Sequence, residues 1–141
     1  MLVRRGITRT VWLTRHHAIK VPSLRRYGRG RGGVLWSICN GILANQSEHR
    51  WWINSHDPAL CPCLHSWFGG IVNVYPRCDP IGDDYAGPWP EPQWPGPMPG
   101  DHKPDNYGRL GGRLVRIDYD MSRTDHGHGF DQPCDCGSQP R

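Results

Sequence analysis

The stretch GDHKPDNYGRLGGRLVRIDYD, residues 100–120, joins a polar loop to two short runs of alternating apolar residues. These runs lie within residues 107–120 and are separated by Gly111 and Gly112. A Gly-Gly pair between two such runs is a strong signal for a tight hairpin turn. We therefore expect a β-hairpin here, with the polar loop directly before its first strand.

The acidic and amide side chains of this stretch lie at the two ends of the expected hairpin. Asp101, Lys103 and Asn106 precede its first strand, and Asp118 follows its second. Because a hairpin returns the chain to its starting point, we expect Asp101, Asn106 and Asp118 to converge. Carboxylate and amide oxygens suit Mg²⁺, which proteins hold through one or two carboxylates together with substrate phosphates. Lys103 would then neutralise a nearby phosphoryl group.

A second hairpin is expected earlier in the chain. Residues 7–14 (ITRTVWLT) and 18–22 (AIKVP) have strand composition and are separated by a short polar segment. The two-residue period of a strand places Lys20 on the face opposite to Ile19 and Val21. A proline then ends the second strand.

The middle of the chain predicts one helix and further strand structure. Residues 34–55 (VLWSICNGILANQSEHRWWINS) show helical spacing, which we expect to be interrupted at Gly41. The apolar positions that carry this spacing are Leu35, Ile38, Ile42, Leu43 and Trp51. Glu48 lies near the helix end, where the helix dipole does not favour a carboxylate, so we expect it to have another partner. Residues 67–76 (WFGGIVNVYP) predict a strand pair or one long strand.

Two segments are expected to be irregular. Residues 76–100 form a proline- and tryptophan-rich insert that is unsuited to helix or sheet, and its Trp89 and Trp94 suggest that it packs on something. Residues 122–141 form a polar tail with few apolar residues, which we expect to be extended or flexible. Residues 1–121 would then form a single domain.

The composition agrees with one small domain. A chain of 141 residues supports a core, but only 36% of the residues are apolar, and 18 glycines and 14 prolines indicate many turns and loops. The net charge is +4, and basic residues concentrate in the first 31 positions. This concentration indicates either a solvated basic face or a site for a phosphate-bearing partner.

The polar loop and the two expected hairpins together resemble the catalytic core of the protein-kinase-like fold. In that family an Asp precedes an Asn by five residues, and a hairpin then leads to a metal-binding Asp. Here DHKPDN at 101–106 matches the loop, and IDYD at 117–120 stands where the metal-binding triplet is expected. AIK at 18–20 is similar to the strand that carries the kinase lysine, and a helix with Glu48 follows it. The implied fold is α+β: a small antiparallel sheet with one main helix, then the catalytic-loop-like segment, the hairpin and the irregular insert.

The resemblance implies a role for each matching residue on the catalytic side. Lys20 would hold the α- and β-phosphates of ATP and be positioned by an ion pair with Glu48. Asp101 would orient or deprotonate the acceptor hydroxyl, and Lys103 would stabilise the phosphoryl group in transfer. The acceptor would be a protein hydroxyl or a small molecule.

It also implies how the cofactor would be held. Asn106 and Asp118 would bind Mg²⁺. The backbone around 75–79 would meet the adenine, which makes Tyr75 and Arg77 candidate nucleotide-binding residues. ATP and Mg²⁺ are therefore the expected cofactors.

The sequence departs from the family at several positions. No glycine-rich phosphate loop precedes Lys20, Pro99 replaces the usual His before the catalytic Asp, and Asp120 replaces the final Gly of the metal triplet. Little sequence follows residue 121, so most of the helical lobe is expected to be missing, as in a trimmed version of the kind that phages encode. A protein partner or a homo-oligomer would then supply the missing wall.

Other interpretations stay open. The chain would instead be a pseudoenzyme that binds a nucleotide or a protein partner without catalysis. Lys20 would alternatively be an exposed strand lysine, Glu48 a solvated helix acid and residues 101–106 an ordinary polar turn. A third interpretation is a binding protein in which Zn²⁺ joins Cys61 and Cys63 to Cys134 and Cys136, although C-x-C is not the usual spacing for zinc.

The expected location is cytoplasmic. The first residues lack the continuous apolar segment of a signal peptide, so we expect the six cysteines to be reduced thiols. No stretch approaches the length of a membrane span, so no membrane partner is expected. The Arg- and Gly-rich residues 25–33 are similar to RNA-binding segments, but the run is a single short one, and we do not expect nucleic acid as a partner.

Overall fold

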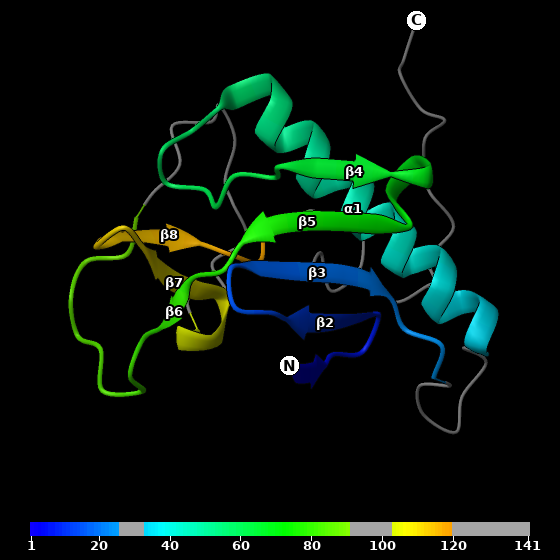
Figure 1. The fold of residues 1–141 in the computed structure, drawn as a ribbon, viewed down its shortest axis with the longest axis horizontal. Helices are drawn as coiled ribbons and strands as arrows, with labels where there is room; N and C mark the ends of the chain where they lie inside the picture. Colours follow the sequence, from blue (N-terminus) through cyan, green and yellow to red (C-terminus); the bar gives the residue numbers. More distant parts are fainter. Residues whose placement is uncertain (26–32, 91–102, 120–141) are drawn as a thin grey trace, which may run out of the picture.

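The computed structural model describes residues 1–25, 33–90 and 103–119. These residues form an α+β fold in which a five-stranded antiparallel sheet packs against one main helix, α1, and a small three-stranded antiparallel sheet lies at one end (Figure 1). In the described part of the chain, no helix has the length and hydrophobicity that a membrane span requires.

The large sheet contains the hairpin predicted at residues 7–22. Its strands are β1 (Leu2–Arg5), β2 (Arg9–Leu13), β3 (His17–Pro22), β4 (His65–Trp67) and β5 (Val72–Pro76). Their order in the sheet is β1-β2-β3-β5-β4. β2 and β3 confirm the predicted hairpin, and β4 and β5 show that residues 67–76 belong to a strand pair. The connection between β4 and β5 is a 3₁₀ turn, Phe68–Gly70, in which all three residues have positive φ.

Helix α1 covers Val34–Ser55, the range that the sequence predicts, but it is not interrupted at Gly41. A Cβ atom at Gly41 would collide with the carbonyl oxygen of Thr8 and lie 2.8 Å from the Cα atom of Pro22. The glycine therefore allows the helix to approach β3 closely, and it does not break the helix. The helix ends at His56, whose left-handed backbone directs its N–H to the carbonyl of Trp52.

The buried face of α1 differs from the expected apolar stripe. Leu35 and Leu43, which carried the predicted spacing, are exposed. The buried positions are Ser37, Gly41, Ala44, Asn45, Glu48 and Trp51. The helix thus turns a partly polar face toward the sheet, so the interface between them needs polar partners.

The small sheet contains the hairpin predicted around Gly111 and Gly112. It is made of β6 (Asp79–Pro80), β7 (Tyr107–Leu110) and β8 (Arg113–Arg116), in this order. Gly111 and Gly112 have φ of 57° and 81°, as a two-residue turn with two left-handed positions requires. β6 corrects the prediction that the whole insert is irregular, because its two residues pair with β7.

The insert also packs on the small sheet. Trp89 lies with its ring centroid 4.4 Å from that of Tyr107, which confirms that this tryptophan has a partner within the chain. Trp94 and the tail 122–141 lie outside the described residues. The core joins the end of α1, β5 and β8, so it lies where the two sheets meet. Its buried members are Trp51, Leu60, Cys61, Cys63, Tyr75, Val115 and Tyr119.

Candidate functional site

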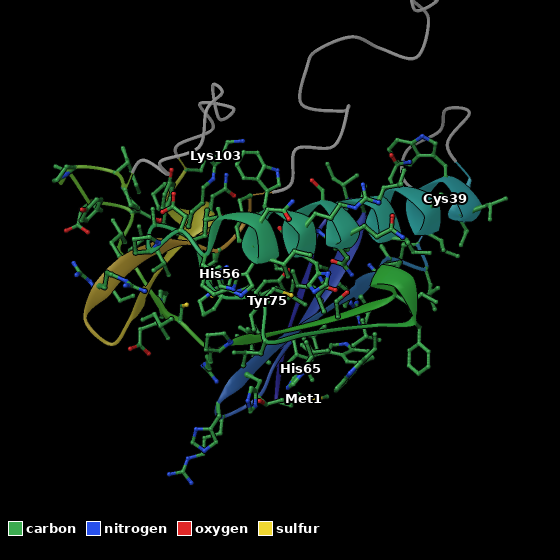
Figure 2. All side chains as sticks on the ribbon, turned by 90° about the horizontal axis from the view of Figure 1, so that it is seen from above. Met1, Cys39, His56, His65, Tyr75 and Lys103 are labelled. Atoms are coloured by element: carbon green, nitrogen blue, oxygen red, sulfur yellow. The ribbon has the colours of Figure 1, made fainter. Side chains whose placement is uncertain are left out.

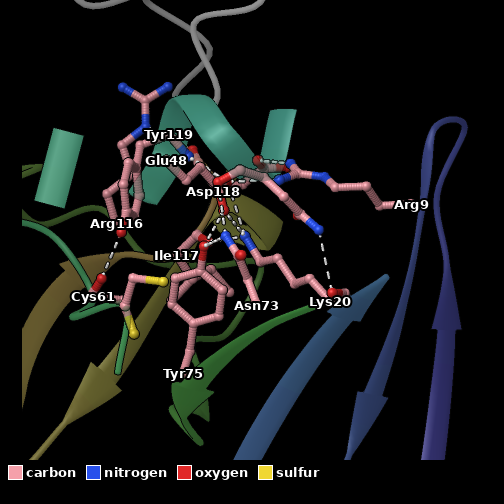
Figure 3. A network of polar contacts seen from close by, with 12 residues as sticks. Arg9, Lys20, Glu48, Cys61, Asn73, Tyr75, Arg116, Ile117, Asp118 and Tyr119 are labelled. Carbon is pink, nitrogen blue, oxygen red and sulfur yellow. Dashed lines mark hydrogen bonds and ion pairs between the residues drawn. The ribbon is translucent and has the colours of Figure 1, made fainter. Parts of the chain in front are cut away.

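Four charged side chains meet between the large sheet, α1 and the end of β8 (Figure 3). Arg9 comes from β2, Lys20 from β3, Glu48 from α1, and Asp118 follows β8. Two positive and two negative charges therefore balance at this point.

Lys20 and Glu48 form the ion pair that the family resemblance implies. The Lys20 Nζ atom lies 2.9 Å from Oε1 and 2.8 Å from Oε2 of Glu48, and it donates to the carbonyl of Ile117 at 2.7 Å. Lys20 is only 7% exposed and Glu48 is fully buried. The alternatives in which Lys20 is an exposed strand lysine and Glu48 a solvated acid are therefore wrong. The ammonium group has three N–H donors, and three protein oxygens lie within hydrogen-bond distance of it.

The buried Glu48 carboxylate has further partners. The Tyr75 hydroxyl donates to Oε2 at 2.6 Å, the Tyr119 N–H donates to Oε1 at 3.3 Å, and Arg9 forms an ion pair with Oε1 at 2.8 Å. Burial, followed by the charge of Glu48, raises the pKa of Tyr75, so its hydroxyl stays protonated and remains a donor. These partners offset the free-energy cost of burying the Glu48 charge.

Two buried asparagines fix α1 on the sheet beside this pair. The Asn45 amide donates to the carbonyl of Gly70 at 2.8 Å, and the Asn73 amide donates to the carbonyl of Asn45 at 2.7 Å. Asn73 also donates to the Tyr75 hydroxyl at 3.0 Å. The polar face of α1 is therefore held in one position relative to β3 and β5.

Arg9 connects Glu48 to Asp118. Its guanidinium forms an ion pair with each carboxylate. Partial desolvation raises the pKa of Asp118, but the charges of Arg9 and Lys20 outweigh this effect and hold the pKa well below its usual range. The Asp118 side chain is 46% exposed, so an ionised carboxylate lies at the edge of the network.

Arg9 is a member of the network that no motif predicts, because in the sequence it is one of many basic residues. The hairpin register is the signal that identifies it. Arg9 lies opposite Pro22, and Val11 lies opposite Lys20. Because paired residues of antiparallel strands share a face, Arg9 belongs to the face of Lys20.

The predicted convergence of Asn106 and Asp118 is present in the backbone. The carbonyl of Asn106 accepts the N–H of Ile117 at 2.8 Å and that of Asp118 at 3.3 Å. Asn106 ends a 3₁₀ turn, Pro104–Asn106, and its N–H donates to the carbonyl of the exposed Lys103. Asp101 lies outside the described residues, so its place relative to Asp118 stays a prediction.

Tyr75 and Arg77 lie on β5 and directly after it, but much of their polar surface is used within the chain. Tyr75 lies between α1 and the sheet (Figure 2), and its hydroxyl is bound to Glu48. The Arg77 N–H donates to the carbonyl of His16 at 2.8 Å, and its guanidinium donates to the carbonyl of Thr14 at 2.6 Å. Their role toward adenine stays a prediction, in which the Arg77 N–H would have to leave His16.

The cysteines are arranged differently from the zinc hypothesis. The Cys61 Sγ lies 3.6 Å from the Cys78 Sγ, whereas the Cys63 Sγ is directed to the carbonyl of His65 at 3.5 Å. Within the three described ranges, no group of three or more His, Cys, Asp or Glu side chains is arranged to hold a metal ion. Cys134 and Cys136 lie outside these ranges, so a zinc site that uses them stays a prediction.

Comparison of the chain with protein-family models, curated proteins and solved structures finds no match. The geometry of the charged network is therefore the basis for inferring function. It offers an ionised, half-exposed carboxylate beside Asn106, and two buried cations whose positions are fixed by Glu48.

Proposed function

We propose that the chain is a minimal kinase-like protein that binds ATP with Mg²⁺ and transfers a phosphoryl group to a protein or small-molecule hydroxyl. The observation that carries this proposal is the buried Lys20–Glu48 ion pair beside Asp118. The lysine lies on the third strand, the glutamate on the following helix, and the aspartate after the hairpin. In protein kinases the same three residue types must be in place on corresponding elements for activity.

The donor set at the end of the hairpin fits Mg²⁺. Asp118 supplies an ionised carboxylate, and the backbone carbonyl of Asn106 accepts the Asp118 N–H. Asn106 would add its side-chain amide oxygen, and carboxylate and amide oxygens are ligands that Mg²⁺ prefers. Bound there, Mg²⁺ would neutralise charge on the phosphate oxygens.

The chain's own residues would do the remaining work. Lys20 would exchange its contact with the Ile117 carbonyl for a phosphate oxygen while Glu48 keeps the ammonium in position. Asp101 would accept the proton of the acceptor hydroxyl, and Lys103 would stabilise charge on the phosphoryl group. Phosphoryl transfer is mainly a matter of such positioning and charge neutralisation.

A second candidate function is nucleotide binding without catalysis. It is favoured by the Arg9–Asp118 ion pair, because Arg9 already places a positive charge on the carboxylate that would hold the metal.

The first experiment is a calorimetric titration of ATP, with and without Mg²⁺, into the wild-type chain and the Asp118→Ala variant. We expect binding that requires Mg²⁺ and is lost in the variant. Asp83→Ala is the matched control, because Asp83 is an exposed acid outside the network and its removal should leave binding unchanged. Absence of binding at millimolar ATP would overturn both candidate functions.

Transfer is tested separately with γ-labelled ATP and a panel of protein and small-molecule hydroxyl acceptors. If the chain transfers the phosphoryl group, we expect the labelled phosphate on an acceptor or on the chain itself, and its loss in Asp101→Ala. Binding of ATP without any transfer would favour the second candidate.

A further inference from the structure

Two cysteines that the candidate site does not use lie side by side at the junction of the two sheets. Cys61 belongs to the segment between α1 and β4, and Cys78 comes directly after β5. Their Sγ atoms are 3.6 Å apart. Cys61 is buried, whereas Cys78 is partly exposed.

We propose that Cys61 and Cys78 are a redox modification site, which hydrogen peroxide converts into a reversible disulfide. A disulfide has a sulfur–sulfur distance of roughly 2.05 Å, so the two atoms would have to approach by about 1.5 Å. The inference is independent of the proposed kinase-like function.

The environments of the two thiols assign their roles. The hydrogen bond with Cys61 lowers the pKa of Cys78, whereas this bond and burial raise the pKa of Cys61. Cys78 therefore ionises first and is the more exposed residue of the pair, and both properties favour reaction with peroxide. Cys63 differs, because burial raises its pKa to about 11 and its sulfur is directed to His65.

The reaction has two steps. The Cys78 thiolate attacks one peroxide oxygen, the O–O bond breaks, and a sulfenic acid forms while hydroxide leaves and takes up a proton as water. The Cys61 sulfur then attacks the Cys78 sulfur, the S–O bond breaks, and the departing hydroxide takes the Cys61 proton as a second water. Two thiols are thus oxidised by two electrons to one disulfide, and one peroxide is reduced to two waters.

The disulfide would join the end of the large sheet to the segment that contacts the small sheet. Cys61 is already tied to the small-sheet side, because its N–H donates to the carbonyl of Arg116 and its carbonyl accepts the Tyr119 hydroxyl, each at 2.8 Å. Cys78 leads from β5 into β6. The disulfide would therefore link the end of β5 covalently to the segment that holds Arg116 and Tyr119.

The test treats the reduced full-length chain with hydrogen peroxide, blocks the remaining thiols, and maps linked peptides by mass spectrometry. We expect a peptide that joins Cys61 to Cys78, which disappears on treatment with dithiothreitol. Cys78→Ser should abolish it. Cys39→Ser is the control, because Cys39 is exposed on α1 away from the pair and its removal should leave the link intact.

The wild-type map alone decides the question, so the result does not depend on how the variants fold. Links that involve only other cysteines would overturn the proposal. Oxidation of Cys78 to sulfinic acid while Cys61 remains a free thiol would also overturn it. The assay contains no nucleotide, so a failure here leaves the proposed kinase-like function untouched, and a failure to bind ATP leaves this inference untouched.

Discussion

Among single residues, Glu48 neutralises the two cations of the network. It is fully buried and contacts both Lys20 and Arg9. Glu48→Gln would leave two buried cations facing a neutral amide, and breaking a buried ion pair in this way costs about 3–5 kcal/mol. We expect a loss of this size in the free energy of unfolding, measured by urea denaturation.

The matched control for Glu48→Gln is an exposed ion pair. Arg4 and Asp105 lie 3.8 Å apart and both side chains are largely exposed, so Asp105→Asn should cost no more than about 1 kcal/mol. Equal effects of the two substitutions would contradict the view that the buried network stabilises the fold.

Asp118 makes the stability depend on pH. Partial desolvation raises its pKa, but the charges of Arg9 and Lys20 outweigh this effect, so the pKa in the folded chain lies below the value of about 3.9 in an unfolded chain. Its charge therefore stabilises the fold above about pH 4, and this contribution is lost as the pH falls further. The difference in unfolding free energy between wild type and Asp118→Asn should be largest at pH 7 and shrink below about pH 4. A difference that stays constant from pH 7 to pH 3 would be inconsistent with this account.

The site residues were only partly predictable from the sequence. Lys20, Glu48, Asn106 and Asp118 were singled out by the resemblance to a kinase-like motif. The structure brings Lys20 into contact with Glu48 and Ile117, and joins the backbones of Asn106 and Asp118. Arg9 was missed because no motif contains it, and its partner Asp118 lies 109 residues away. Only the register of the hairpin relates Arg9 to Lys20.

At the scale of elements, Gly41 sets how closely α1 approaches the sheet. Ala at this position would gain about 1 kcal/mol of helix propensity. Its Cβ, however, would collide with the backbone of Thr8 and Pro22, neither of which is a flexible side-chain end. We therefore expect Gly41→Ala to lower the thermal unfolding midpoint. Cys39→Ala, an exposed change on the same helix, should leave the midpoint unchanged or raise it. A higher midpoint for Gly41→Ala would show that the helix shifts without cost.

The elements that the sequence predicted well are those with local signals. The bounds of α1 follow from helical spacing over 22 residues, and the hairpin of β7 and β8 follows from the Gly111-Gly112 turn. The two-residue strand β6 carries no alternating pattern and is defined by its pairing with β7. The buried face of α1 was mispredicted because Asn45 and Glu48 are buried for their polar partners, which hydrophobic spacing does not detect.

In the whole molecule, the network is a connection between two sheets that are otherwise formed by separate parts of the chain. Arg9 and Lys20 belong to the large sheet, and their contacts with Asp118 and Ile117 reach the segment after β8. Such contacts join residues that are far apart in sequence, so they form only when both hairpins are already in place. The junction is thus the part of the fold that depends most on tertiary contacts.

Hydrogen exchange of Arg9→Gln would test this dependence. The substitution removes the charge that bridges Glu48 and Asp118, so we expect faster exchange at the Ile117 and Asp118 amides, with smaller changes in β3 and β5. Arg9→Lys should restore only part of the protection, because an ammonium group lacks the planar fork that contacts two carboxylates at once. Arg4→Gln, at an exposed pair, should leave both sheets unaffected. Uniformly faster exchange along the chain in Arg9→Gln would mean that Arg9 stabilises the fold as a whole and that the two sheets open together. Unchanged exchange would mean that the contacts of Asn106 with residues 117 and 118 suffice to hold the junction.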